Sequence, residues 1–132
     1  MTASSVDQNT LRRRGTGLRA LDEKRAFPGY TLFAPITGGG EVYLIDLQGR
    51  VVHEWHLSHP PGAYGYLLAN GNLFYSGKTR ENLEDVPWWF KGGVVLEADP
   101  AGRILWEYRH PTHHHDARRL ANGNTILICS RT

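Results

Sequence analysis

The chain contains two copies of one pattern of turns and strands, and this duplication restricts the possible folds more than any other feature. The segments DLQGRVVHEWHL and YGYLLANGNLFYS recur as DPAGRILWEYRH and DARRLANGNTILI. Gly49 and Gly102 are separated by 53 positions, and Asn70 and Asn122 by 52. A period of about fifty residues with four strands in each period is typical of the blades of a β-propeller.

The sequence pattern of the rest of the chain also indicates β-structure. Short runs of β-branched, aromatic and aliphatic residues alternate with Gly, Pro, Asn and Asp, and no window has a helical apolar stripe, so we expect an all-β fold. Asp46–Gly49 and Asp99–Gly102 have the chemistry of type I turns, and the two Ala-Asn-Gly-Asn segments predict tight hairpins. The predicted strands are Tyr30–Ala34, Val42–Asp46, Val51–Leu57, Tyr64–Leu68, Leu73–Ser76, Val94–Glu97, Ile104–Arg109, Asp116–Leu120 and Thr125–Cys129.

These strands predict a partial propeller preceded by an arm. Residues 1–26 are expected to form a flexible N-terminal arm, and residues 27–132 an incomplete propeller domain. Its parts would be three strands of one blade (30–57), a full blade (64–109) and the start of the next (113–129). Closed propellers have four to eight blades. We therefore expect an N-terminal fragment of a longer protein, with self-association through its open strand edges as a second consequence.

Composition limits the partners. A formal net charge of +2 with 21% charged residues predicts no nucleic-acid partner. No apolar run is long enough for a signal-peptide core or a membrane span, so we expect a cytoplasmic chain without a membrane partner. Cys129 is the single cysteine, and we expect it to pack as a small hydrophobe.

Three histidines and an aspartate stand directly before the last predicted hairpin, at His113–Asp116. If the segment were extended, alternation would let at most two of the four face a central channel together. The run fits three interpretations: solvated rim residues, a metal site, or acid/base and nucleophilic chemistry on an anionic ester. The spacing matches no established metal-ligand motif, so no metal is predicted. The third interpretation is favoured because Arg118 and Arg119 follow and could hold anionic oxygens.

Two further groups of residues are candidates for the same channel. Tyr64 and Tyr66 correspond to Asp116 and Arg118 under the repeat, so their hydroxyls would either donate to an anion or fill the propeller centre. The long loop Gly77–Gly93 carries Trp88 and Trp89, which would either stack on an aromatic substrate or pack over a neighbouring blade.

The order of these segments resembles the bacterial arylsulfate sulfotransferases that do not use PAPS. AFPGYTLFAP, VYLIDLQGRVVHEWHL, YGYLLANGNLFYSGK, GGVVLEADPAGRILWEYRHP and HHHDARRLANGNTILIC carry the resemblance. It implies a six-bladed β-propeller that moves a sulfuryl group from an aryl sulfate donor to a phenolic acceptor through a sulfohistidine, without a cofactor. The fragment alone would be inactive. The implied catalytic residues are His115, His114 and Arg119, and the implied substrate-binding residues are His113, Arg118, Tyr66, Trp88 and Trp89.

Two other functions remain open at this point. A non-catalytic binding propeller is one, because DPAGRILW also resembles the blade motif of quinoproteins with one residue fewer. The other is a metal-dependent hydrolase or lactonase on the same fold.

Overall fold

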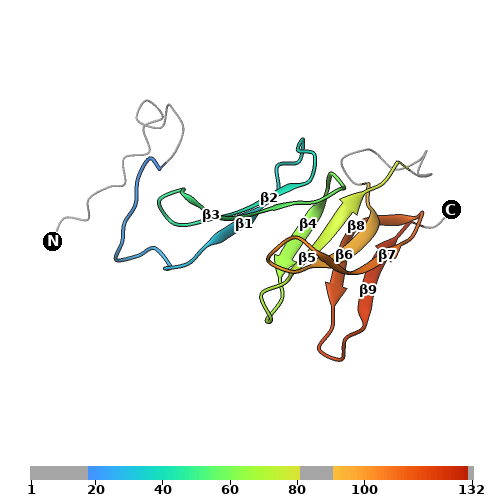
Figure 1. The fold of residues 1–132 in the computed structure, drawn as a ribbon. Coiled ribbons are helices and arrows are strands. Elements are labelled where there is room, and N and C mark those ends of the chain that lie inside the picture. Colours follow the sequence, from blue (N-terminus) through green and yellow to red (C-terminus); the bar gives the residue numbers. More distant parts are fainter. Residues whose placement is uncertain (1–17, 81–90, 131–132) are drawn as a thin grey trace.

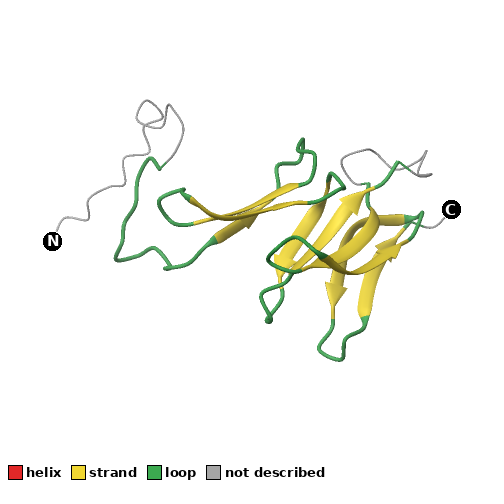
Figure 2. Ribbon diagram, viewed as in Figure 1, coloured by secondary structure: helices red, strands yellow, loops and turns green. Residues whose placement is uncertain are grey.

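A computed structural model describes residues 18–80 and 91–130, which form nine strands in three antiparallel sheets (Figures 1 and 2). This confirms the all-β fold. No helix in the described part of the chain is long and apolar enough to cross a membrane. The strands are β1 (Thr31–Phe33), β2 (Glu41–Ile45), β3 (Val51–His56), β4 (Pro61–Leu67), β5 (Leu73–Lys78), β6 (Gly93–Ala98), β7 (Ile104–Arg109), β8 (His113–Arg119) and β9 (Thr125–Cys129).

The second sheet, ordered β4-β5-β6-β7, is the centre of the structure. The first sheet (β1-β2-β3) packs on one of its faces and the third sheet (β8-β9) on the other. One apolar cluster joins the first and second sheets through buried side chains such as Val42, Trp55 and Tyr75. A second cluster joins the second and third sheets through Phe74, Val95 and Ala117. Because both of its faces are covered, β5 is buried along its whole length.

The repeat predicted from the sequence is also present in the turns. In each Asp-to-Gly turn the aspartate carboxylate accepts the backbone N–H four residues later and an arginine Nε–H, at 2.6–2.9 Å. The closing residues Gly49 and Gly102 both have a φ of 80°, a conformation that costs glycine little. The two hairpins therefore have the same shape, although their sequences differ at the middle positions.

The predicted starts of β4 and β8 were wrong. Both strands begin three residues earlier, at Pro61 and His113, because each contains a bulge. His113 pairs with Cys129 and Ala117 with Leu127, so β8 advances four residues while β9 advances two. β4 has the same irregularity opposite β5. The histidines therefore lie inside a strand, and the simple alternation expected for an extended segment does not hold across residues 114–116.

Candidate functional site

His113 is held inside the fold by both of its ring nitrogens. The side chain has no exposed surface, and its Nδ1 accepts the backbone N–H of Gly93 at 3.1 Å. The proton therefore sits on Nε2, which lies 3.3 Å from the backbone oxygen of Asp116 and donates to it. Burial lowers the pKa of His113, and the charges of nearby histidines act in the same direction. A neutral His113 thus fixes the bulge of β8 against β6.

Two glycines at the start of β6 make this close approach feasible. A Cβ on Gly92 would lie 1.8 Å from the backbone oxygen of His114 and 2.4 Å from Nδ1 of His113. Gly93 has a φ of 121°, which other residues rarely adopt. Because Gly92 and Gly93 have no side chains, the backbone at the start of β6 leaves room for His113 and the backbone of His114.

His114 and His115 form a pair in the bulge. Their Nδ1 atoms are in hydrogen-bond contact, and the two rings meet edge to face with centroids 4.5 Å apart. One Nδ1 must donate and the other accept, so the contact suits two neutral rings and disfavours two charged ones. Burial lowers the pKa of His114, and the charge of His115 lowers it further. The ring that donates through Nδ1 has an unprotonated Nε2, the form of imidazole that acts as a nucleophile or a base.

Arg118 and two tyrosines bring strands β4 and β8 together. The Arg118 guanidinium carbon lies 5.0 Å from the ring centroids of both Tyr64 and Tyr66, a cation–π geometry. Burial raises the pKa of Tyr64, so its phenol is neutral and can donate a hydrogen bond. The side chain of Arg118 is exposed, so a positive charge held on two aromatic rings faces solvent near the bulge.

Arg119 points to a different place. Its guanidinium pairs with Glu97 at 3.1 Å and lies 4.3 Å from the ring centroid of Trp106. Its backbone N–H donates to the hydroxyl of Tyr66 at 2.8 Å. These contacts join the third sheet to the second, which is a structural role. The catalytic role expected for Arg119 stays a prediction.

Of the remaining expected residues, Trp88 and Trp89 lie outside the described residues. Asp116 was not assigned a catalytic role from the sequence, yet its Oδ1 is buried and has no hydrogen-bond partner among residues 18–80 and 91–130. A buried, unsatisfied carboxylate oxygen is costly and marks a position that a donor would stabilise. The signals in the sequence were its place in the run His113–Asp116 and its alignment with Tyr64 under the repeat.

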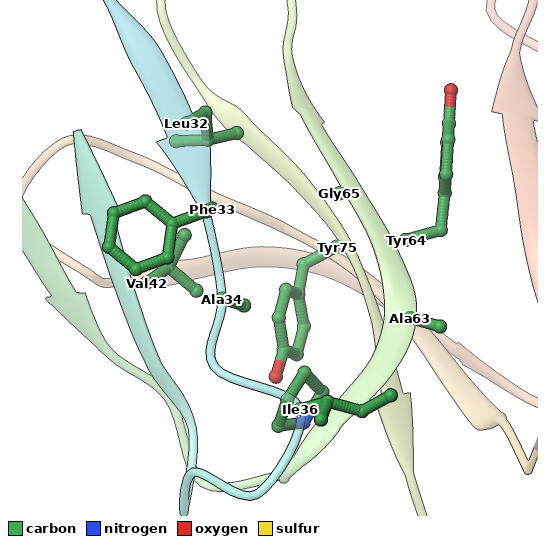
Figure 3. A pocket seen from close by; sticks show the side chains of 10 residues that line it. Leu32, Phe33, Ala34, Ile36, Val42, Ala63, Tyr64, Gly65 and Tyr75 are labelled. Carbon is green, nitrogen blue, oxygen red and sulfur yellow. The ribbon is translucent and has the colours of Figure 1, made fainter. Parts of the chain in front are cut away.

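An apolar pocket of about 300 Å³ lies between the first and second sheets, at strand β4 (Figure 3). Its size is at the lower end of the range usual for small-molecule sites. Figure 3 shows the ring of Tyr75 among Val42, Ala34 and Ile36, with Tyr64 projecting away from them. The Tyr75 hydroxyl donates to the backbone oxygen of His59 at 2.9 Å. The sequence did not indicate this pocket.

Across residues 18–80 and 91–130, no group of three or more His, Cys, Asp or Glu side chains is placed to hold a metal ion. The chain matches no protein-family model, no curated protein and no solved structure.

Proposed function

We propose that this chain forms part of a β-propeller which, when its ring is closed, transfers a sulfuryl group from an aryl sulfate ester to a phenol. The resemblance to arylsulfate sulfotransferases suggests the reaction. The arrangement of the sheets supports the architecture, because a four-stranded sheet is packed between two related sheets. In this arrangement β4 and β8 are inner strands, and β8 presents its bulge to the channel.

The observation that carries the proposal is the contact between His114 and His115. In the first half-reaction an unprotonated imidazole nitrogen attacks the ester sulfur. An N–S bond forms, the ester S–O bond breaks, and the electron pair leaves with the phenolate. In the second half-reaction the acceptor phenol gives its proton to solvent, its oxygen attacks the sulfur, and the N–S bond breaks with its electron pair returning to the imidazole nitrogen. Each half-reaction is a displacement at sulfur, so no redox partner is needed.

Positive charge at the right position would lower the barrier for both steps. The exposed guanidinium of Arg118 can bind sulfuryl oxygens, and the neutral phenol of Tyr64 can donate to a developing phenolate. The sequence ranked His115 before His114 as the reacting residue. Here the reacting nitrogen is placed on His114, because burial lowers the pKa of this ring and keeps it unprotonated at neutral pH. His115 then supplies or receives the proton on the shared Nδ1 contact.

The test is transfer from 4-nitrophenyl sulfate to phenol by the protein with its propeller ring closed, followed by release of coloured nitrophenolate. His114→Ala and His115→Ala are expected to lower the rate about 100-fold or more. His56→Ala, at an exposed position on β3, is the matched control and should keep full activity. Intact-mass measurement after exposure to donor alone should show one added sulfuryl group, lost in His114→Ala. Full activity in both bulge variants would refute the role of the pair.

The apolar pocket beside Tyr75 favours a second function, a binding propeller without chemistry. This function predicts that the chain binds phenols without any sulfuryl adduct, and that Ala63→Phe, which fills the pocket, abolishes binding. Calorimetric titration with phenol distinguishes it from the transferase.

A further inference from the structure

The three sheets differ in their number of strands, and the sequence repeat shows which strands are equivalent. By their pairing, β1, β5 and β9 occupy the same position in the three sheets. Thr31, Leu73 and Thr125 are equivalent, and so are the two residues that follow each of them. The segment Thr-Leu-Phe of β1 therefore corresponds to Thr-Ile-Leu of β9. The two strands are chemically matched over these three residues.

β1 is an incomplete partner for β2. It pairs with only three of the five residues of β2, whereas β5 pairs with all six residues of β6. The chain leaves β1 through Pro35, which has no N–H with which to continue the pairing. Within the described chain, no strand pairs with the other edge of β1. The apolar pocket lies beside this edge, next to β4, where an inner strand of the first sheet would run.

β9 has the complementary property. It is five residues long, and among the described strands only β8 pairs with it. Ile126 and Ile128 project from the face opposite Leu127 and are 57% and 50% exposed. An edge strand with two exposed isoleucines is a strong template for pairing with another chain.

We propose that β9 of one copy of the chain pairs with β2 of a second copy, in place of β1 of that second copy. The pairing of β5 with β6 fixes the register, so Thr125 would pair with Ile45 and Cys129 with Glu41 of the second copy. All five residues of β2 then have a partner, whereas β1 pairs with only three of them. The joint sheet has the order β8-β9-β2-β3 and four strands, like the second sheet. β8 then fills the space of the apolar pocket. Ile126 and Ile128 cover the apolar surface of the second copy against which its own β1 had packed.

Contacts between the first and second sheets provide independent support. Trp55 Nε1 donates to the backbone oxygen of Asp99 at 3.0 Å, and His53 Nε2 donates to that of Pro100 at 2.8 Å. β3 is thus fastened to the Asp99–Gly102 turn. On β7, Tyr108 is equivalent to Trp55 and Trp106 is equivalent to His53. Tyr108 is 45% exposed.

In the joint sheet, the Asp46–Gly49 turn of the second copy occupies the corresponding place against β7. This turn has the same internal hydrogen bonds as Asp99–Gly102, so it presents its carbonyls in the same way. A surface that accepts one turn should therefore accept the other.

The contact is head-to-tail, so repeating it gives a ring or a filament. Each copy contributes two complete four-stranded sheets. Closure into a ring rests on the proposed propeller, for which two to four copies would give the about four to eight sheets of known propellers. Strand exchange itself does not depend on the transfer chemistry.

The first test uses the single natural cysteine. Wild-type chain is mixed with Glu41→Cys/Cys129→Ser and oxidised, because paired strands place these two positions within disulfide range. A disulfide should join position 129 of one chain to position 41 of the other, as identified by peptide mass spectrometry. Neither chain alone should cross-link, and a mixture with Gln48→Cys/Cys129→Ser should not either. Equal cross-linking in the unmixed samples would overturn the proposed register.

The second test is the mass in solution, measured by light scattering across a concentration series without substrate. Wild type should exceed the 14.9 kDa of one chain, with two to four copies expected. Ile126→Lys should return the protein to a monomer, whereas Leu105→Lys, at a side chain 56% exposed on β7, should not. A monomer at every concentration, together with no cross-link, would refute strand exchange even if the chain transferred sulfuryl groups. Assembly without transfer would refute only the proposed chemistry.

Discussion

Acid should destabilise this fold through His113, and the sign follows from its surroundings. The ring is fully buried, and it is neutral because Nδ1 accepts from Gly93. A proton on Nδ1 would oppose that N–H and place a charge where water does not reach. The pKa of His113 is therefore lowered from 6.5 in the folded state. The unfolded chain binds the proton first, so the free energy of unfolding falls as the pH drops below about 6.5 and levels off below the lowered pKa.

The size of the effect is limited by one proton. A single group contributes at most about 1.4 kcal/mol per pH unit within the window between its two pKa values. Burial and the nearby charges of His110, His114 and His115 all lower the pKa of His113, so the window opens on the acid side of neutrality. Adding acid from pH 8 should leave stability nearly constant until about pH 7 and then lower it steeply.

The measurement is urea unfolding followed by tryptophan fluorescence at pH 8.0, 6.5 and 5.5. His113→Gln should remove the part of the acid dependence that His113 contributes, because an amide can accept from Gly93 and donate to Asp116 without titrating. The part that remains belongs to groups such as His114, whose pKa is also lowered. His56→Gln, at an exposed position on β3, should behave like wild type. His113→Ala should cost about 2–5 kcal/mol at any pH, since it leaves a cavity and an unpaired N–H. An acid dependence that persists unchanged in His113→Gln would refute the reasoning.

Three more substitutions test the packing of the sheets. Gly92→Ala should abolish folding or displace β8, because its Cβ would lie 1.8 Å from a backbone oxygen; near-native circular dichroism and melting would contradict this. Trp55→Phe should lower the free energy of urea unfolding by about 1–3 kcal/mol through loss of the donor to Asp99, and an unchanged midpoint would count against the contact. Arg119→Met should cost about 1–3 kcal/mol, because Glu97 loses its ion-pair partner at Oε2 and keeps the hydrogen bond from Asn72 at Oε1. The double variant with Glu97→Gln should recover part of that loss in thermal denaturation, and strict additivity would show that the pair is not coupled.

The strands and turns were predictable because they depend on local chemistry. Alternating apolar residues and the Asp-to-Gly turns located all nine strands, and the repeat identified which strands correspond. The starts of β4 and β8 were not predictable. Pro61–Ala63 and His113–His115 lack strand-forming residues, and they join the sheets only through pairing beyond a bulge. Such pairing depends on partners far along the chain, which propensity does not report.

The candidate site was predictable in composition but not in geometry. Residue types and charge drew attention to the run of histidines and to Arg118, and the structure brings His114 and His115 into contact. The sequence could not separate His113, which anchors the strand, from the pair beside it. That separation depends on Gly92 and Gly93, which approach from another strand. The ion pair between Arg119 and Glu97 likewise depends on tertiary packing, so the sequence alone did not predict it.

The recurrence of the bulge explains how one backbone can hold such different chemistry. In β4 the bulge contains Gly62–Tyr64, and in β8 it contains His114–Asp116, yet the flanking residues pair in the same way. The paired positions on either side fix the path of the chain, and the three residues between them contribute no regular ladder pairing. Bulges are frequent beside active sites because they aim side chains without breaking the sheet. The same bulge therefore holds Gly-Ala-Tyr beside the apolar pocket in β4 and His-His-Asp, with its pair of contacting imidazole rings, in β8.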